Sequence, residues 1–369
     1  MKKLMTILGT RPEMIRLSSV IAELDNYFDH ILVHTGQNTN ANMKQVFFDD
    51  LGIRAPNYSF EMNSINLGTS LSLLFEKMSE IFDLEKPDAL VILGDTNSGL
   101  ISILAKRLNI PIYHLEAGNR SYDNNVPEEI NRKIIDHSSD FNLVYTEHAR
   151  RNLLAEGIHP RTIFLIGSPM REVLNKNLIA IKESNVLERL DLHKNGYLLL
   201  SLHRQENTNS AVQLMKVVEN VRIAAEELGK QVLFSAHPRT LSKIDEYSLK
   251  LPASFTCVPA LGFLDYNNLQ LNSFITLSDS GSISEESAIL NFPAVTIRDS
   301  MERPEALEAG SISMSGSSSG NLSNAIRLMR SNSRRSVPVE YQIEDTSTRV
   351  INVILSTLDL YEDWFAIRR

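Results

Sequence analysis

The chain has 369 residues, of which 43% are hydrophobic and 22% charged, values that indicate a folded globular protein of about two domains. Its 45 acidic and 37 basic side chains leave a net charge of −8, which argues against a protein that binds nucleic acid or a membrane surface. The single cysteine, Cys257, excludes an internal disulfide and a cysteine-based metal cluster. The apolar run at residues 4–8 is too short for a signal peptide, and no run approaches the roughly 20 residues of a membrane span, so we expect a soluble, cytoplasmic protein.

The first half of the chain alternates short apolar runs with segments of helical period. The runs predict buried strands at residues 3–8, 31–33, 89–93, 112–115, 141–144 and 162–166. After the first run, Thr10 can cap a helix whose first turn holds Pro12 and whose apolar positions include Ile15, Val20 and Leu24. Strands that alternate with helices in this way predict a parallel sheet.

The second half repeats this alternation after a polar stretch at residues 182–194. Its apolar runs predict further strands at residues 197–200, 232–234, 255–258, 274–277 and 294–297. The clearest helix has an apolar stripe made of Leu214, Val217, Val218, Val221, Ala225 and Leu228. We therefore predict an α/β protein of two similar halves and a last helix at residues 347–364.

Charged side chains follow the first and third predicted strands, at the edge where parallel sheets bind ligands. Residues 9–13, GTRPE, form a tight turn into a helix, in which backbone N–H groups and the Arg11 guanidinium suit a phosphate or carboxylate. An ordinary turn with a solvated arginine explains the same residues equally well. Asp95, after the third strand, is either a functional carboxylate or the cap of the following helix.

Further carboxylates follow the fourth predicted strand. Glu116 ends an apolar run, where it is poorly solvated and has no helix to cap. Glu128 and Glu129 open the next helix, a position that the helix dipole alone also favours. Because carboxylates crowded at one sheet edge raise at least one pKa, the group can provide an acid beside a base.

Two pairs of histidine and arginine follow successive strands of the second half. His203 and Arg204 come after the first of these strands, and His237 and Arg239 come after the next. A lone histidine is most often structural, but a repeated pair favours a phosphoester site or acid–base chemistry near neutral pH.

Residues 278–288, SDSGSISEESA, carry the most specific local signal. A strand ends, a turn exposes the backbone N–H groups of Ser280, Gly281 and Ser282, and a helix begins, which together can cradle a pyrophosphate. In that helix, Glu286 can accept hydrogen bonds from a ribose diol, whereas Glu285 is explained equally well as a capping-box residue. The next loop supplies Arg298 and Arg303, which we expect to close over a cleft between the halves.

Taken in chain order, seven segments resemble the non-hydrolysing UDP-N-acetylglucosamine 2-epimerase family. They are residues 9–13 (GTRPE), 94–96 (GDT), 116–118 (EAG), 127–132 (PEEINR), 203–204 (HR), 279–286 (DSGSISEE) and 302–305 (ERPE). The resemblance implies a GT-B architecture with Rossmann-like domains at residues 1–168 and 169–346, a nucleotide sugar between them, and a C-terminal helix at 347–369 that packs on the first domain. It also implies no metal or redox cofactor, and we expect a homodimer.

The resemblance implies an elimination followed by an addition. In the family, the C2 proton is removed and UDP is expelled to give a 2-acetamidoglycal, and UDP and a proton then return on the other face. Asp95, Glu116 and Glu128 would handle the C2 proton and the sugar charge, with their division into acid and base left open, and His203 would assist at UDP. The implied UDP-sugar contacts are Arg11, Arg16, Arg132, Arg204, His237, Arg239, Ser280, Gly281, Ser282, Glu286 and Arg303.

Three features depart from the pattern of enzymes that act on UDP-N-acetylglucosamine. Arg16 replaces the usual lysine, and Ser282 replaces the second glycine of the cradle. Residues 35–40, TGQNTN, lack the usual His-Arg after glutamine, in a region where bacterial members also bind an activating second nucleotide sugar. With residues 46–54 (VFFDDLGIR), this resembles the branch that converts UDP-2-acetamido-2,6-dideoxy-L-talose to UDP-N-acetyl-L-fucosamine for surface polysaccharide, the reaction that we predict.

Several alternatives stay open at this point. The first is the interconversion of UDP-N-acetylglucosamine and UDP-N-acetylmannosamine. A hydrolysing 2-epimerase is disfavoured by Glu128 and by the Arg11 turn. A GT-B glycosyltransferase needs an acceptor surface, often apolar and basic, and a nucleotide-sugar sensor does not need so many carboxylates.

Overall fold

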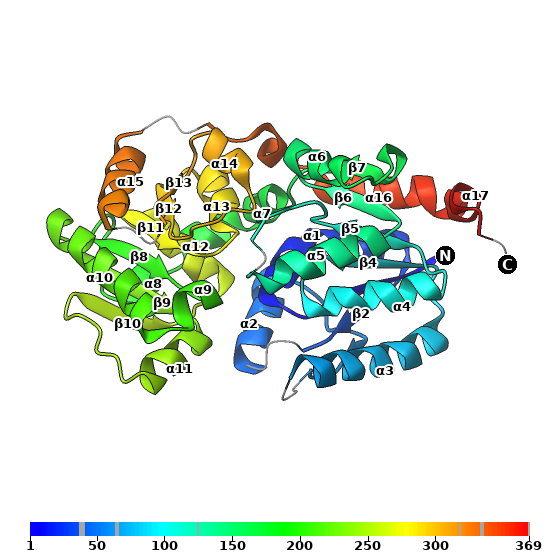
Figure 1. Cartoon of the computed structure of the whole chain (residues 1–369), viewed down its shortest axis with the longest axis horizontal. Helices are drawn as coiled ribbons and strands as arrows, with labels where there is room; N and C mark the ends of the chain where they lie inside the picture. Colours follow the sequence, from blue (N-terminus) through cyan, green and yellow to red (C-terminus); the bar gives the residue numbers. More distant parts are fainter. Residues whose placement is uncertain (37–40, 63–65, 124, 317–318, 333–335, 368–369) are drawn as a thin grey trace. The chain divides into compact units, whose positions relative to one another are not determined.

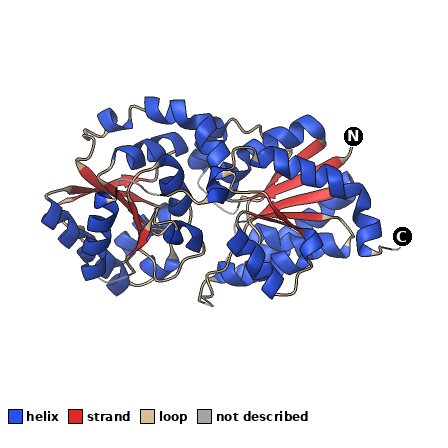
Figure 2. Cartoon of the chain, turned by 90° about the horizontal axis from the view of Figure 1, so that it is seen from above, coloured by secondary structure: helices blue, strands red, loops and turns tan. Residues whose placement is uncertain are grey.

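The computed structural model describes residues 1–36, 41–62, 66–123, 125–316, 319–332 and 336–367 (Figure 1). The chain divides into two compact units, one made of Met1–Val173 with Gln342–Arg369 and the other of Leu174–Tyr341. The sequence predicts boundaries after residues 168 and 346, a few residues from this division. In Figure 2, helices flank the strands of each unit on both sides.

The sheet of the first unit is parallel throughout and has the order β3-β2-β1-β4-β5-β6-β7. Its strands are β1 (Lys3–Leu8), β2 (Asp29–His34), β3 (Tyr58–Ser59), β4 (Ala89–Leu93), β5 (Ile112–Leu115), β6 (Phe141–Val144) and β7 (Ile163–Leu165). The direction of winding reverses between β1 and β4, which makes the carboxyl ends of these two strands a topological switch point.

The helices and 3₁₀ turns of the first unit follow the predicted alternation. They are α1 (Arg11–Tyr27), α2 (Ala41–Leu51), α3 (Leu67–Glu85), η1 (Asn97–Ile101), α4 (Ser102–Arg107), α5 (Pro127–Ser138), α6 (Glu147–Ala155), η2 (Pro160–Thr162), α16 (Thr346–Thr357), η4 (Leu358–Leu360) and α17 (Tyr361–Phe365). α7 (Met170–Glu183) begins in this unit and ends in the other. α16 packs against α1, so the C-terminal segment completes the first unit.

The sheet of the second unit is also parallel and has the order β10-β9-β8-β11-β12-β13. Its strands are β8 (Tyr197–Ser201), β9 (Gln231–Ala236), β10 (Phe255–Pro259), β11 (Ile275–Ser278), β12 (Ala294–Thr296) and β13 (Ser313–Met314). Its helices are α8 (Val186–Arg189), α9 (Gln205–Thr208), α10 (Ala211–Leu228), α11 (Pro238–Glu246), α12 (Phe263–Asn272), α13 (Ile283–Leu290), α14 (Pro304–Glu308), α15 (Ser319–Ser331) and the 3₁₀ turn η3 (Val339–Gln342). The switch point lies between β8 and β11.

The central strands are apolar on both faces because helices cover both faces of each sheet. Leu198 and Leu200 of β8 pack in one hydrophobic cluster with the buried stripe of α10, whereas Tyr197 and Leu199 pack in a second cluster. A strand buried on both faces has a continuous apolar run instead of an alternating one, which is why the runs in the sequence identified these strands. No helix in the described part of the chain is long and apolar enough to span a membrane.

Two features of the fold differ from the prediction. The edge strands β3 and β13 were not predicted, because two residues are too few to show a period. The prediction of one continuous last helix is wrong, because the 3₁₀ turn η4 separates α16 from α17. Thr357, at the end of α16, donates to the Val353 carbonyl at 2.7 Å and contacts the Tyr113 hydroxyl at 2.8 Å. Beyond this turn, Phe365 packs edge-on against Phe141.

Gly118, in the turn after β5, tests how closely this turn packs against α6. Its φ is +79°, and a Cβ atom would lie 2.4 Å from the Ala149 carbonyl oxygen. We expect Gly118→Ala to reduce the free energy of unfolding by about 3 kcal/mol or more, because left-handed strain and a backbone clash add. The matched control is Gly157→Ala, with φ +87° and nothing within 4 Å of the added atom, which should cost only about 1 kcal/mol. Equal losses in urea denaturation of the two variants would contradict this account.

Candidate active site

The candidate residues of the first unit lie where its central strands end. Arg11 follows β1, Asp95 follows β4 and Glu116 follows β5. These strands are neighbours in the sheet, so the topology brings the three turns to one edge at the switch point.

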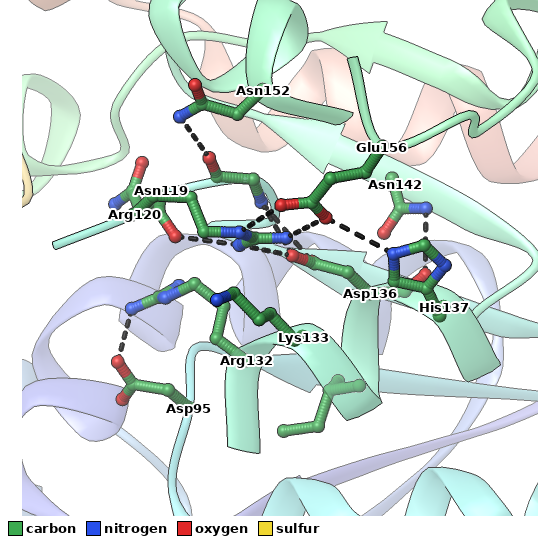
Figure 3. A network of polar contacts seen from close by, with 12 residues as sticks. Asp95, Asn119, Arg120, Arg132, Lys133, Asp136, His137, Asn142, Asn152 and Glu156 are labelled. Carbon is green, nitrogen blue, oxygen red and sulfur yellow. Dashed lines mark hydrogen bonds and ion pairs between the residues drawn. The ribbon is translucent and has the colours of Figure 1, made fainter. Parts of the chain in front are cut away.

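Asp95 and Glu116 share one guanidinium. Arg132, on α5, pairs with the Asp95 carboxylate (Figure 3). Its Nη2 also lies 3.2 Å from Glu116 Oε1. Its Nη1 also donates to the Glu116 carbonyl oxygen at 2.6 Å. Arg16 Nε lies 3.2 Å from the other carboxylate oxygen of Glu116. The site therefore contains two carboxylates and two guanidinium groups, in which Arg132 lies between Asp95 and Glu116 and Arg16 contacts the far side of Glu116.

The two carboxylates differ in their access to solvent. The side chains of Glu116, Arg16 and Arg132 are at most 6% exposed, whereas the Asp95 side chain is 19% exposed. The N-cap of the following 3₁₀ helix is Thr96, so Asp95 lies one residue before the cap position. Asp95 is thus the carboxylate of this pair that a ligand can reach.

Glu116 has strained backbone. Its φ is +64°, in the left-handed region that side-chain-bearing residues rarely adopt, and it precedes Gly118 by two residues. Strain of this kind persists where the surroundings hold it, and Glu116 is held on both carboxylate oxygens and on its carbonyl. The turn therefore aims the Glu116 side chain at Arg16 and Arg132.

Glu128 and Glu129 have separate environments at the start of α5. Glu129 is buried and accepts a hydrogen bond from the Ser121 backbone N–H at 2.8 Å, with Lys133 Nζ at 3.3 Å. Glu128 is half-buried in the same first turn. Glu129 thus anchors the preceding loop, and Glu128 is the glutamate accessible to a ligand.

Glu13 connects two of the turns at this edge. It accepts hydrogen bonds from the backbone N–H groups of Gly9 and Thr10 at 3.0 and 2.7 Å and from the Thr10 hydroxyl at 2.7 Å. The hydroxyl of Thr96, beside Asp95, donates to its other oxygen at 3.0 Å. Burial raises the pKa of Glu13 to about 7 against these four hydrogen bonds. Burial also lowers the pKa of Arg11, which lies over the Phe47 ring.

In the second unit, a buried aspartate organises the residues after β8. Asp279 accepts hydrogen bonds from the backbone N–H groups of His203 and Arg204 and from Asn207 Nδ2, each at 3.0 Å. Its Oδ1 lies 2.9 Å from His203 Nδ1. Burial alone raises the pKa of Asp279, but the His203 imidazole and these donors outweigh burial and lower it. The imidazole of His203 is therefore held by a carboxylate.

The turn after β11 packs directly on Arg303. A Cβ atom on Gly281 would lie 2.5 Å from Arg303 Nη1 and 3.7 Å from Arg204 Nη2, so a larger residue would require the Arg303 guanidinium to shift. Ser280, Gly281 and Arg303 line one small pocket together with Arg298. Glu285 lies 3.2 Å from Arg303 Nε, and Ser282, the N-cap of α13, makes no side-chain cap hydrogen bond. Small residues and guanidinium groups around one pocket suit a phosphate.

The remaining candidate residues of the second unit differ in burial and in their hydrogen-bond partners. Glu286 is buried and accepts a hydrogen bond from Gln270 Nε2 at 2.6 Å. The His237 ring lies 6.3 Å from that of His203, and its Nδ1 accepts the Arg239 backbone N–H at 3.2 Å. His237 therefore caps α11, and the side chain of Arg239 is exposed. The Ser282 hydroxyl lies 3.0 Å from that of Ser280.

Comparison with known proteins identifies the family. A family model described as UDP-N-acetylglucosamine 2-epimerase matches residues 22–355. A solved UDP-N-acetylglucosamine 2-epimerase from Rickettsia bellii is 43% identical, with a TM-score of 0.92, over 99% of this chain and 100% of that one. The chain belongs to the UDP-N-acetylglucosamine 2-epimerase family. The resemblance seen in the sequence is confirmed at this level, as is the GT-B fold class.

Two further similar 2-epimerases are named for different nucleotide sugars. The Methanocaldococcus jannaschii UDP-GlcNAc 2-epimerase, solved in complex with UDP-GlcNAc and UDP, is 34% identical, with a TM-score of 0.90, over 96% of this chain and 99% of that one. A Pseudomonas aeruginosa UDP-2,3-diacetamido-2,3-dideoxy-D-glucuronate 2-epimerase is 32% identical over 84% of this chain and 86% of that protein. Residues 37–40, on which the predicted substrate branch depends, lie outside the described residues.

Sequence reasoning did not select three buried acids of this epimerase. Glu13 and Asp279 lie inside quoted motifs, and Asp136 lies four residues after Arg132 on α5. The partners of each include backbone N–H groups, which no residue type in the sequence reveals. For Glu13 and Asp279, the available signal was a carboxylate in a glycine-containing segment after a strand, where burial is costly unless the carboxylate is bound.

Glu13 predicts a measurable pH dependence of stability. Because its pKa is about 7 in the folded chain and near 4.5 in the unfolded chain, the folded state binds more protons between these values. The free energy of unfolding should therefore fall by up to about 3 kcal/mol as pH rises from about 5 to about 8, and Glu13→Gln should lose this component. Urea denaturation of both proteins across this range measures it. Parallel pH profiles would contradict the assignment.

Proposed function

We propose that this chain epimerises C2 of UDP-N-acetylglucosamine without releasing free sugar. The observation that carries the proposal is the pair Asp95 and Glu116 on the shared Arg132, because the reaction needs both a proton acceptor and a stabiliser of sugar charge at one place. Family membership and the M. jannaschii relative, solved with UDP-GlcNAc and UDP, support the substrate.

A second candidate substrate is UDP-2-acetamido-2,6-dideoxy-L-talose. The observation that favours it is the segment 35–40, TGQNTN, which lacks the His-Arg expected for UDP-N-acetylglucosamine. The P. aeruginosa relative is named for a different sugar, so membership of the family does not by itself determine which substituents the sugar carries. The same elimination and addition at C1 and C2 serves either substrate.

In the proposed reaction, the first unit acts on the sugar. A carboxylate removes the C2 proton, the C1–O bond to UDP breaks with its electron pair leaving on the diphosphate, and a C1–C2 double bond forms. We assign the proton transfers to Asp95 and Glu128, which are accessible, with their order left open. Glu116, buried between Arg16 and Arg132, supplies negative charge to the electron-poor C1.

The second unit binds UDP in this proposal. Its small-residue turn at Ser280 and Gly281, beside Arg204 and Arg303, suits the diphosphate, whose charge increases as it leaves. His203, oriented by the Asp279 carboxylate, can donate a proton or hydrogen bond to the leaving oxygen. Glu286 on α13 remains the proposed ribose ligand. UDP then re-adds at C1 while a proton returns to the other face of C2.

The substrate and the mechanism are tested in one experiment in heavy water. Each nucleotide sugar is offered separately, and the products are followed by NMR. We expect UDP-N-acetylglucosamine to equilibrate with UDP-N-acetylmannosamine, with solvent deuterium at C2 of the product, because the proton leaves during elimination. Turnover of the 6-deoxy-L-talo sugar alone would establish the second substrate. A product without label would reject the elimination, and accumulation of free UDP with free sugar would indicate a hydrolysing enzyme.

Asp95→Asn tests the assignment of the accessible carboxylate. An amide cannot accept the C2 proton, so we expect kcat to fall by at least about 100-fold while UDP affinity stays near normal. The matched control is Asp88→Asn. Asp88 lies directly before β4, at the opposite end of the strand from Asp95, and accepts the Lys3 backbone N–H at 2.7 Å. Steady-state rates and calorimetry with UDP measure both. A near-normal kcat for Asp95→Asn would remove Asp95 from the mechanism.

A further inference from the structure

A buried polar network lies behind the two turns that carry Asp95 and Glu116, and Asp136 of α5 is its centre (Figure 3). Asp136 is fully inaccessible to solvent. Its Oδ2 lies 2.7 Å from Arg120 Nη1, and its Oδ1 lies 2.9 Å from His114 Nδ1. Both of its oxygens accept the Gly118 backbone N–H at 3.2 Å. One carboxylate thus binds the backbone of the turn that begins with Glu116.

His114 extends this network to the neighbouring turn. It lies within β5, is fully buried, and its Nε2 donates to the Gly94 carbonyl oxygen at 2.8 Å. Because a carbonyl oxygen only accepts hydrogen bonds, Nε2 carries a proton. The peptide that His114 holds joins Gly94, at φ +74°, to Asp95. Through His114, Asp136 therefore also holds the turn that carries Asp95.

Asp136 carries negative charge in this position. Burial by itself raises its pKa, but the His114 imidazole and the Arg120 and Arg132 guanidinium groups outweigh burial and lower it. Arg120 is also bound by the two oxygens of Glu156, at 2.8 and 2.6 Å from its Nε and Nη2. The Asp136 carboxylate is thus bound to an arginine that is itself held in place. From this fixed position, Asp136 can hold two turns at the edge of the sheet.

α5 applies this restraint together with Arg132. Arg132 and Asp136 are four residues apart, on one face of the helix. Arg132 holds the side chains of Asp95 and Glu116, and Asp136 holds the backbone of the same two turns, directly at Gly118 and through His114 at Gly94. Side chains and backbone of both turns are therefore restrained from a single rigid element.

We propose that His114 and Asp136 are positioning residues of the epimerase reaction, which set the Gly94 and Gly118 peptides so that Asp95 and Glu116 meet at Arg132. The inference rests on the proposed function. Neither residue touches substrate, because both side chains are inaccessible. Stability alone does not account for the pair, since buried ion pairs can be exchanged for apolar residues at little cost in stability. Misplacement of a reacting group by about 1 Å can cost about 100-fold in rate.

Substitutions of His114 separate its two contacts. His114→Asn places an amide nitrogen near the Nδ1 position, so it keeps the contact with Asp136 and loses Gly94. His114→Gln places one near Nε2, so it can still donate to the Gly94 carbonyl. The matched control is His30→Asn: His30 is also buried in this sheet, with Nδ1 2.6 Å from Asp25 Oδ1 and Nε2 2.8 Å from the Thr6 hydroxyl, but it holds no site turn.

We expect a fall in kcat of about 100-fold for His114→Asn, with KM and UDP affinity within about twofold of wild type. His114→Gln should recover about tenfold of that loss through one restored hydrogen bond, and His30→Asn should keep kcat within about threefold. Equal effects of His114→Asn and His30→Asn, or no advantage of Gln over Asn, would overturn the inference. If the asparagine variant does not fold, a His114→Gln kcat as low as about one hundredth of wild type would overturn it.

Hydrogen exchange gives a readout that does not depend on the reaction. In His114→Asn, faster amide exchange is expected in peptides that cover residues 94–97 and 116–119, and not in the His30→Asn control. Unchanged exchange in both segments would overturn the inference. A wild-type protein inactive on both nucleotide sugars would reject the proposed function, and the exchange data would still decide whether His114 and Asp136 hold the two turns.

Discussion

The Arg132 guanidinium is the interaction on which the rest of the first unit depends. Asp95 and Glu116 arrive at one sheet edge on neighbouring strands, and without a shared cation they would repel each other in a site with little water. Arg16 places a second positive charge beside Glu116, which further offsets the repulsion between this buried carboxylate and Asp95. The cost of burying four charged groups is offset only because each one has a partner of opposite sign.

The two units use the same kind of restraint on a turn that follows a strand of the sheet. In each, a buried aspartate accepts backbone N–H groups of a turn that carries candidate site residues: Asp136 binds Gly118 in the first unit, and Asp279 binds His203 and Arg204 in the second. Each aspartate also faces a histidine ring nitrogen at 2.9 Å. A carboxylate that accepts several N–H groups holds a turn more rigidly than side-chain packing does, because hydrogen bonds are directional.

Most of the sheet and much of the candidate site were predictable from the sequence. Strands buried on both faces show as apolar runs, and the chemistry-bearing residues follow them directly, so Asp95, Glu116, His203 and Gly281 could be selected without coordinates. The two-residue edge strands and the break before α17 could not, because they depend on pairing and on contacts with Tyr113 and Phe141. The segment 37–40 lies outside the described residues, so the choice of sugar rests on comparison and experiment.

By itself, the sequence determined the α/β class, the two halves, the family and the identity of the groups that carry charge at the strand ends, since these follow from local pattern and residue type. Only the tertiary structure decided how those groups pair. It joined Asp95 and Glu116 through Arg132, paired Glu285 with Arg303, and placed His114 against Gly94. The reason is that ion pairs and backbone hydrogen bonds between neighbouring strands join residues far apart in the chain, and their geometry exists only after the sheet has formed.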